Sequence, residues 1–148
     1  MRVTEDFIFM KRGRLMIEDD ITRKIIGCAM KVHSKLGPGL LESVYGKCLV
    51  YELKTIGFKV EQQKPVPIHY EGVELEGEFR IDILVEDMVV LELKSVESVL
   101  NVHWAQVLTY LKLSGKAVGL LINFNVPHLR HGIKRSVNND LQKKNLPS

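Results

Sequence analysis

The sequence predicts an α/β sandwich in which helices flank a mixed β-sheet. Apolar residues recur every three to four positions from residue 19 to 56, roughly every second position from residue 58 to 96, and almost continuously from residue 117 to 124. The first pattern is typical of helices, the second of half-buried strands, and the third of a strand covered on both faces. A chain of 148 residues fits one domain with its own core.

Two helices are predicted before the first strand. Residues 1–17 show no clear period and are left unassigned. The first helix begins after Asp19 or Asp20, either of which is suitable as its N-cap, and Gly37-Pro38-Gly39 ends it. The second helix covers residues 40–56, where a glycine follows its last turn.

A run of antiparallel strands follows, then a crossover helix and a buried strand. The expected elements are strands at 58–61, 66–70, 78–85 and 88–96, a helix at 101–114 and a strand at 117–124. Pro67 cannot donate a hydrogen bond to a neighbouring strand, so its strand is expected at an edge of the sheet. Asn101 is the expected N-cap of the helix and Gly115 its end. The domain therefore spans residues 18–126, and a basic segment covers residues 127–148.

The composition argues against several classes of protein. No apolar run approaches the roughly 18 residues of a membrane-spanning helix, and acids near the N-terminus argue against a signal peptide. Cys28 and Cys48 lack metal-site spacing and are expected to be reduced thiols of a cytoplasmic protein. Neither GxGxxG nor GxxxxGK[ST] occurs, so a dehydrogenase or P-loop enzyme finds no support.

The basic C-terminal segment is compatible with two roles. The formal charge of the chain is only +3, but five cations stand against one anion, Asp140, in this segment. It can contact nucleic-acid phosphates, or it can be a solvated tail, which is more common for a run of charge. The cations are Arg130, Lys134, Arg135, Lys143 and Lys144.

Charged residues occupy one face of two neighbouring predicted strands. Glu92 and Lys94 share a face of the strand at 88–96, and Asp82 lies on the face of the preceding strand opposite to Ile81 and Ile83. An isolated Glu-x-Lys on a strand is usually a surface salt bridge. A functional site is indicated only if other unusual residues converge on it.

Polar residues in two helices supply that convergence. Glu42 lies beside an otherwise apolar stripe of the second helix, and Gln106 and Tyr110 lie one turn apart in the later helix. Three carboxylates without a histidine or cysteine cluster suit Mg²⁺ or Mn²⁺ better than Zn²⁺. Such an ion with a neighbouring lysine suits phosphodiester hydrolysis.

These residues resemble the signature of the PD-(D/E)XK nuclease superfamily. Asp82 followed by Glu92-Leu93-Lys94 is similar to D…(D/E)xK, and Gln106 with Tyr110 resembles the Q-x-x-x-Y motif of its exonuclease-like branch. The resemblance implies a restriction-endonuclease-like fold and a nuclease activity. Ile81 stands where the signature has proline, which shapes the strand and performs no chemistry.

A narrower resemblance is to the GxxExxY proteins. Residues 39–45, Gly-Leu-Leu-Glu-Ser-Val-Tyr, match the motif that names this branch, and the similarity extends from about Ile21 to Asn125. Glu42 is the acid of the motif and lies where the exonuclease-like branch carries a helical acid.

The resemblance implies a role for each site residue. Asp82 and Glu92 would be metal ligands, with the Leu93 carbonyl as a third and Glu42 as an additional ligand or water-holder. Lys94 would position the attacking water. The remaining two, which would orient the site or contact the nucleic-acid backbone, are Gln106 and Tyr110.

Three histidines are candidates for a general base. His103 precedes Gln106 by three residues and could approach a bound phosphate, but a lone helical histidine is usually a half-buried polar contact. His33 and His69 have less to suggest a role in the site.

The proposed site makes a prediction about strand register. Asp82 and Glu92 share one sheet face only if Val85 pairs with Val89 across a three-residue loop, or if a bulge makes the same correction. A two-residue turn between Val85 and Met88 would place Glu92 on the opposite face and contradict a shared metal.

Two functions follow from the sequence. The leading one is a metal-dependent nuclease acting on DNA or RNA. The other is a non-catalytic nucleic-acid-binding or assembly module on the same fold, because fold does not determine function. No separate specificity domain is visible, so a homodimer or a protein partner is a further expectation.

Overall fold

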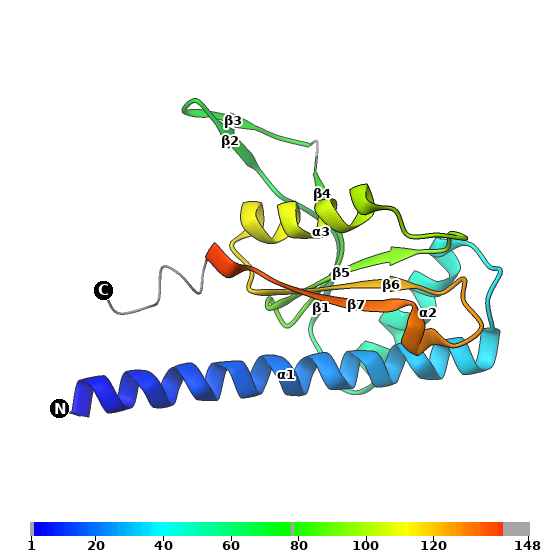
Figure 1. Cartoon of the computed structure of the whole chain (residues 1–148), viewed down its shortest axis with the longest axis horizontal. Coiled ribbons are helices and arrows are strands. Elements are labelled where there is room, and N and C mark those ends of the chain that lie inside the picture. The colour runs from blue at the N-terminus through cyan, green and yellow to red at the C-terminus, as the bar shows by residue number, and fades with distance from the viewer. Residues whose placement is uncertain (1, 78, 141–148) are drawn as a thin grey trace.

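The computed structural model describes residues 2–77 and 79–140, with side chains described from residue 18 (Figure 1). It contains three α-helices, a short 3-10 helix and two β-sheets in this part of the chain. The elements are α1 (Arg2–Leu36), α2 (Glu42–Thr55), β1 (Val60–Pro65), β2 (Ile68–Tyr70), β3 (Val73–Leu75), β4 (Arg80–Val85), β5 (Val89–Lys94), α3 (Asn101–Ser114), β6 (Val118–Asn123), η1 (Leu129–His131) and β7 (Ile133–Val137).

The main sheet has five strands in the order β1-β4-β5-β6-β7. β5 and β6 are parallel and are connected by α3, whereas the other neighbours are antiparallel. This arrangement confirms the predicted mixed sheet flanked by helices, consistent with a restriction-endonuclease-like fold. No helix in the described residues is long and apolar enough to cross a membrane.

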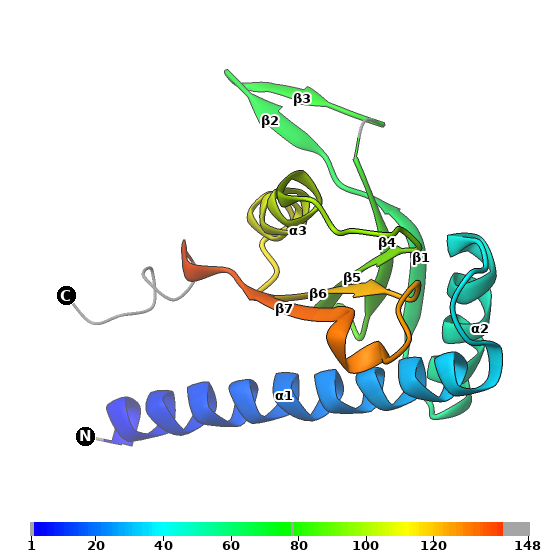
Figure 2. The same cartoon turned by 45° about the vertical axis from the view of Figure 1, so that its right-hand side comes forward.

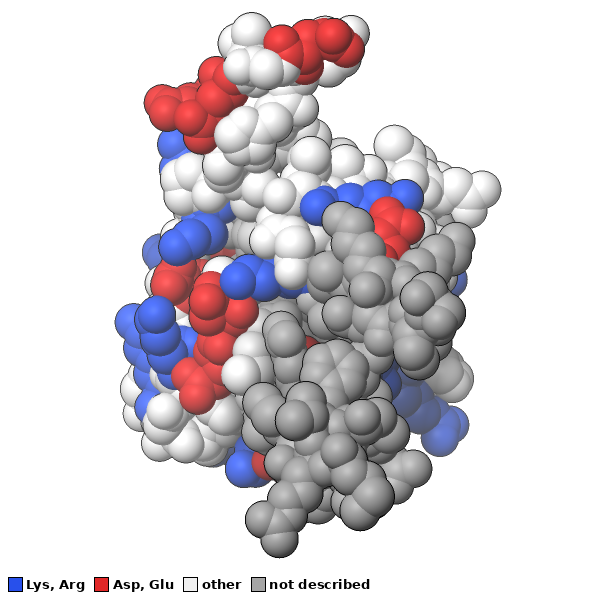
Figure 3. All heavy atoms as spheres, turned by 90° about the vertical axis from the view of Figure 1, so that its left-hand side faces the viewer, with Lys and Arg blue, Asp and Glu red and all other residues white. Residues whose placement is uncertain are grey.

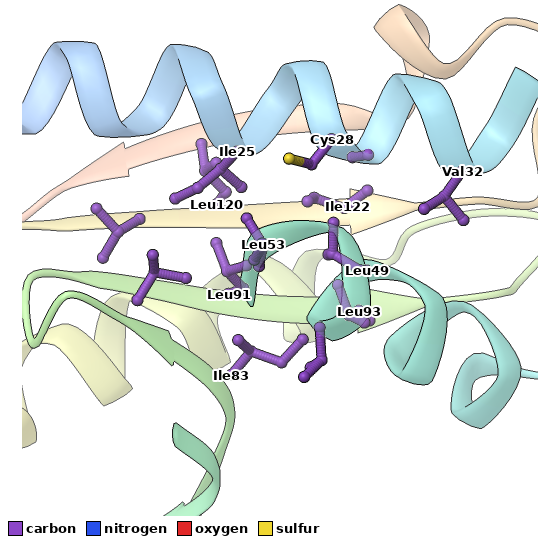
Figure 4. Packing of buried hydrophobic residues seen from close by; sticks show 14 of the residues in the cluster. Ile25, Cys28, Val32, Leu49, Leu53, Ile83, Leu91, Leu93, Leu120 and Ile122 are labelled. Atoms are coloured by element: carbon purple, nitrogen blue, oxygen red, sulfur yellow. The ribbon is translucent and has the colours of Figure 1, made fainter. Parts of the chain in front are cut away.

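Helices cover both faces of this sheet (Figures 1 and 2). The larger core lies between the sheet and the pair α1 and α2, and Figure 4 shows side chains from all three meeting there. The smaller core lies under α3. Alternation along β5 therefore directs Leu91 and Leu93 toward α1 and α2, and directs Val90, Glu92 and Lys94 toward α3.

The first helix is longer than predicted. It begins at Arg2, so neither Asp19 nor Asp20 is its N-cap. No proline interrupts residues 2–36, and both aspartates instead make ion pairs inside or beside the helix.

The second helix begins at Glu42, two residues later than predicted. Asn101 is the first helical residue of α3, and Leu100 is the residue at its N-cap position.

The strand predicted at 66–70 was wrong in its extent and its pairing. Only Ile68–Tyr70 is a strand, and it pairs with β3 in a separate two-stranded sheet whose second strand was not predicted. The edge strand next to β4 is β1, which begins at Val60 and continues to Pro65. β4 begins at Arg80, and Glu78 lies outside the described residues.

The C-terminal segment contributes to the sheet, contrary to the predicted boundary at residue 126. β7 pairs with β6 from Ile133 to Val137. Lys134 lies 5.1 Å from the centre of the Trp104 ring, and Arg135 donates to Asp19 at 2.6 Å. Three cations of this segment are therefore within or beside folded elements, whereas Lys143 and Lys144 lie outside the described residues.

Gly132 is required where β6 meets β7. Its carbonyl accepts from the Asn123 amide at 2.8 Å, and a Cβ at this position would overlap the Asn123 carbonyl oxygen. We expect Gly132→Ala to destabilise the protein by roughly 1–3 kcal/mol, since the backbone must move to make room. Urea unfolding followed by circular dichroism measures this free energy.

Gly27 provides the matched control. It lies in α1 with open space around its Cα, so Gly27→Ala is expected to stabilise the protein by about 0.5–1 kcal/mol through helix propensity. Equal unfolding midpoints for Gly132→Ala and the wild type would contradict the close packing of β6 against β7.

Candidate functional site

The loop between β4 and β5 has three residues, as predicted. Val85 pairs with Val89, so residues 86–88 form the loop, and the register places Asp82 opposite Glu92. Glu86 and Asp87 both have positive φ, of 52° and 55°, which lets the chain reverse within this short loop. The predicted odd-length loop is therefore confirmed.

Asp82 and Glu92 contact each other where the two strands stop pairing. The regular pairs of β4 with β5 end at Ile83 and Leu91. Beyond them, the Asp82 amide donates to Glu92 Oε1 at 3.4 Å, and the Leu93 amide donates to Asp82 Oδ2 at 3.0 Å. The two side chains, hereafter the acidic pair, thus replace backbone partners between the strands.

The acidic pair is electrostatically strained. Glu92 is only 5% exposed, and burial together with the neighbouring Asp82 raises its pKa to about 8. The Lys94 charge opposes this shift. A buried carboxyl beside a second carboxylate releases its proton readily only when a cation compensates both charges.

Tyr110 of α3 belongs to the same neighbourhood. Burial and the charges of Glu92 and Asp82 raise the pKa of its phenol. Its ring packs edge-on against Phe79, with ring centres 5.1 Å apart. Gln106, one turn earlier, is exposed, and its side chain makes no hydrogen bond to another described residue. The structure therefore brings Tyr110, but not Gln106, to the acidic pair.

Glu42 lies in a groove that also reaches Asp82. This site groove runs between the start of α2 and strands β1, β4 and β5, and is lined by Glu42, Ser43, Gly46, Lys47, Gln62, Gln63, Asp82, Ile83 and Leu93. The Ser95 amide donates to Glu42 Oε1 at 3.3 Å, and Ser95 Oγ donates to the Leu40 carbonyl at 2.6 Å. Glu42 is thus connected to the chain directly after Lys94.

The two carboxylates of the acidic pair suit a hard cation, but they are not a complete set of ligands. Two carboxylates with water in the remaining positions are a common way to hold Mg²⁺. Among the residues that the structure describes, no three His, Cys, Asp or Glu side chains come close enough to form a complete cluster of protein ligands. Asp82 and Glu92 are therefore the pair that fits such an ion, and Glu42 is a neighbour within the site groove.

Gln63 distorts the sheet next to Asp82. β1 and β4 keep the same register on both sides of Gln63, but Gln63 and Asp82 themselves do not pair. Gln63 has a φ of 50°. On β4, Ile81 packs in the core under α3 and Ile83 in the core on the other face, so the alternation breaks at Asp82. This kink exposes Asp82 to the site groove. Gln63 differs from the other residues of β1 by its positive φ, and no pattern in the sequence predicts this conformation.

Tyr45 supports the site from within the core. It is fully buried and stacked on Phe124, with ring centres 4.4 Å apart. Its hydroxyl donates to the Gly37 carbonyl at 2.5 Å and accepts from the Leu40 amide at 3.2 Å. The sequence indicates Tyr45 only as the last residue of the motif at 39–45, and not that its hydroxyl holds the loop before α2.

Asn123 fixes the segment that follows Lys94. Its side-chain oxygen accepts from the Val96 amide at 3.1 Å, and its nitrogen donates to the Val96 carbonyl at 2.9 Å. Asn123 is buried at the end of β6, opposite Lys94. No sequence pattern indicated this contact, which joins two distant segments.

Of the three candidate histidines, two make hydrogen bonds to the backbone and the third is exposed on the β2–β3 hairpin. His33 Nε2 lies 2.8 Å from the Val126 carbonyl, and His103 Nδ1 accepts from the Leu100 amide at 3.1 Å at the start of α3. His69 is exposed on β2, opposite Glu74.

Comparison with known proteins identifies one family. A family model described as the PD-(D/E)XK nuclease superfamily matches residues 19–136, which include the acidic pair and most of β7. No curated protein and no solved structure gives a significant match.

Proposed function

The chain belongs to the PD-(D/E)XK nuclease superfamily, and we propose that it is a metal-dependent nuclease hydrolysing phosphodiester bonds of DNA or RNA. The observation that supports this most directly is the contact of Asp82 with Glu92 at the point where β4 and β5 separate. A buried carboxyl with a pKa near 8 beside a second acid is costly in a protein that only needs to fold.

In this proposal Asp82 and Glu92 hold Mg²⁺ or Mn²⁺, with the Leu93 carbonyl as a third ligand. When bound, the ion neutralises charge on the phosphate and lowers the pKa of a bound water. Lys94, which follows Glu92 by two residues on the same strand face, orients the attacking water and stabilises the charge that develops on the phosphate. Glu42 holds a further water from its place in the site groove.

The α3 residues act around this centre. Tyr110 keeps its phenol protonated at neutral pH and can donate a hydrogen bond toward the acids or a phosphate oxygen. Gln106 is exposed one turn before it, where its amide is free to contact the nucleic-acid backbone.

We also place the chain in the GxxExxY branch. Each residue of that motif has a contact or conformation that helps to build the site groove. Gly39 has a φ of 99° in the turn before α2, Glu42 lines the groove, and Tyr45 anchors the loop from the core.

Metal-dependent cleavage is the direct test of the proposal. We expect the wild type to cleave at least one substrate in a panel of single- and double-stranded DNA and RNA with Mg²⁺ or Mn²⁺, and EDTA to abolish cleavage. Asp82→Asn should lose the activity, while Asp87→Asn, an exposed loop residue paired with Lys116, should retain it. Binding without cleavage of any substrate would favour a non-catalytic module.

Metal should also stabilise the folded protein. An ion between Asp82 and Glu92 displaces the Glu92 proton and compensates both carboxylate charges, so the melting temperature should rise with Mn²⁺ concentration in the wild type and in Asp87→Asn but not in Asp82→Asn. The same rise in all three proteins would place the metal elsewhere.

Gln63 offers a test of the groove that separates folding from function. Its positive φ is disfavoured for residues other than glycine, so Gln63→Gly should leave stability unchanged or raise it by up to about 1 kcal/mol. Glu71, at a φ of 51° in the turn between β2 and β3, is the matched control. Only Gln63→Gly should weaken substrate binding, seen as a higher KM, because only Gln63 lines the groove. Equal KM values for both variants would contradict this.

A further inference from the structure

The β2–β3 hairpin forms an arm that stands away from the main sheet (Figures 1 and 2). Its two strands pair only with each other, from Ile68–Leu75 to Tyr70–Val73, across a two-residue turn of Glu71 and Gly72. An isolated two-stranded hairpin is marginally stable in water. The arm, defined as residues 68–75, therefore gains from a surface that covers it.

One face of the arm is entirely apolar. Ile68 and Tyr70 share a face of β2, and the register puts Leu75 and Val73 beside them on the same face. The exposed fractions are 67% for Tyr70, 57% for Val73 and 44% for Leu75. These side chains form a continuous patch, unlike single apolar residues scattered on a surface.

The charge around this patch restricts what can cover it. Residues 65–79 contain no lysine or arginine, whereas Glu71, Glu74 and Glu76 lie at the tip, the back and the base of the arm. Figure 3 shows acidic side chains gathered on the arm at the top of the molecule. Nucleic acid and anionic membranes would be repelled, so an apolar protein surface with cations at its rim fits best.

The chain itself carries such a surface between α1 and α2. This α1–α2 groove is mainly apolar, with Leu36, Cys48 and Tyr51 in its lining, and Lys35 and Lys47 beside them. Tyr51 is 68% exposed. Lys31 already pairs with Glu52 at 3.0 Å, but neither Lys35 nor Lys47 forms an ion pair with another described residue.

The arm cannot reach this groove within one copy. The arm lies beyond α3 at one end of the molecule, and the groove lies at the corner where α1 turns into α2, with the sheet between them (Figure 1). We propose that the arm of each copy docks into the α1–α2 groove of a second copy. A two-fold axis makes the exchange reciprocal, so two equal contacts close the dimer and double the area that one small arm can bury.

Polar substitution on the arm tests the apolar contact. We expect the wild type to be a dimer by sedimentation velocity, and Tyr70→Thr with Val73→Thr to be monomeric. Threonine suits a strand and both side chains are exposed, so the circular dichroism spectrum should be unchanged. Tyr51→Gln in the groove should also yield monomers.

Charge reversal gives a sharper test. Glu71→Lys with Glu76→Lys on the arm should weaken the dimer, and so should Lys35→Glu with Lys47→Glu at the groove. The protein carrying all four changes should dimerise again, because opposite charges then face each other with the signs exchanged. Lys54→Glu with Glu97→Lys, two exposed positions outside both surfaces, is the control and should remain dimeric.

The outcomes decide the proposal without reference to nuclease activity. Loss of the dimer in each of the two charge-reversed double variants, and its recovery in the variant that carries all four changes, would establish the contact. A wild type that stays monomeric over the whole concentration range would overturn it. So would a dimer that none of these substitutions weakens, since the copies would then meet elsewhere.

Discussion

Glu92→Gln is expected to abolish cleavage and, at alkaline pH, to make the metal-free protein more stable than the wild type. Glutamine keeps the shape of the side chain but has no charge with which to hold a cation. The loss in kcat/KM should be on the order of a hundredfold or more, since a ligand to the ion stabilises the transition state by several kcal/mol. The gain in stability follows from the pKa of Glu92.

The sign of the stability effect depends on pH. The folded-state pKa of Glu92 is raised to about 8 from its ordinary value of 4.5 by burial and by Asp82. Between these values the unfolded chain releases a proton that the folded protein retains, so folding becomes less favourable as pH rises, by about 1.4 kcal/mol per pH unit at most. Below the ordinary value the penalty is absent, and above pH 8 it is complete.

Thermal unfolding in EDTA at several pH values measures this difference. Near pH 4.5 the melting temperatures of Glu92→Gln and the wild type should be similar. The variant should then exceed the wild type by a margin that grows steadily toward pH 8.5. Glu97→Gln, an exposed glutamate outside the acidic pair, should follow the wild type throughout. A pH-independent difference would mean that Glu92 is not buried as a protonated acid.

Tyr45→Ala should have the largest effect on stability, a loss of roughly 3–5 kcal/mol. The residue is fully buried and stacked on Phe124, so its removal leaves a cavity in the larger core. It also leaves the Gly37 carbonyl without the Tyr45 hydroxyl. Because Ser95 binds both the Leu40 carbonyl and Glu42, disorder in this loop should spread to the site groove.

Tyr45→Phe separates the two contributions. It keeps the ring and removes only the hydroxyl, so the loss should be about 1–2 kcal/mol. Val102→Ala, at an exposed position of α3, is a control that should change the free energy of unfolding by less than about 0.5 kcal/mol. Urea titration provides all three values. Equal losses for Tyr45→Ala and Tyr45→Phe would show that the stacked ring contributes nothing.

The central strands could be predicted because their pattern leaves few choices. Charged residues alternate with apolar ones at 80–82 and 92–94, and placing Asp82 beside Glu92 fixes the register to one value, which the three-residue loop realises. The buried strand β6 was equally clear from its apolar run. A local pattern suffices when it determines both the element and the face that is buried.

Other elements depend on contacts that no local pattern contains. Asp19 and Asp20 have the chemistry of helix caps, and only the continuation of α1 shows that they are internal. β7 carries Lys134 and Arg135 on a short edge strand, which resembles a charged tail until β6 is present to pair with it. β3 and its pairing with β2 were missed because β3 has only three residues.

The sequence predicts which residues belong to the candidate site, but only part of how they are arranged in space. Asp82, Glu92 and Tyr110 meet because adjacent strands and the crossover helix must bring them together. Gln106 has the expected spacing, yet it is exposed one turn before Tyr110 and its side chain makes no hydrogen bond to another described residue. The kink at Gln63 and the anchoring by Asn123 arise from tertiary contacts and had no signal in the sequence.

The contact between Trp104 and Lys134 provides an optical probe of β7. The chain has one tryptophan, and it lies in the first turn of α3 with a cation from β7 over its ring. Its fluorescence therefore reports on whether β7 is docked against the rest of the sheet. Since β7 leaves the ribosome after the other four strands of the main sheet, the same signal shows when this sheet is completed relative to the helices that precede it.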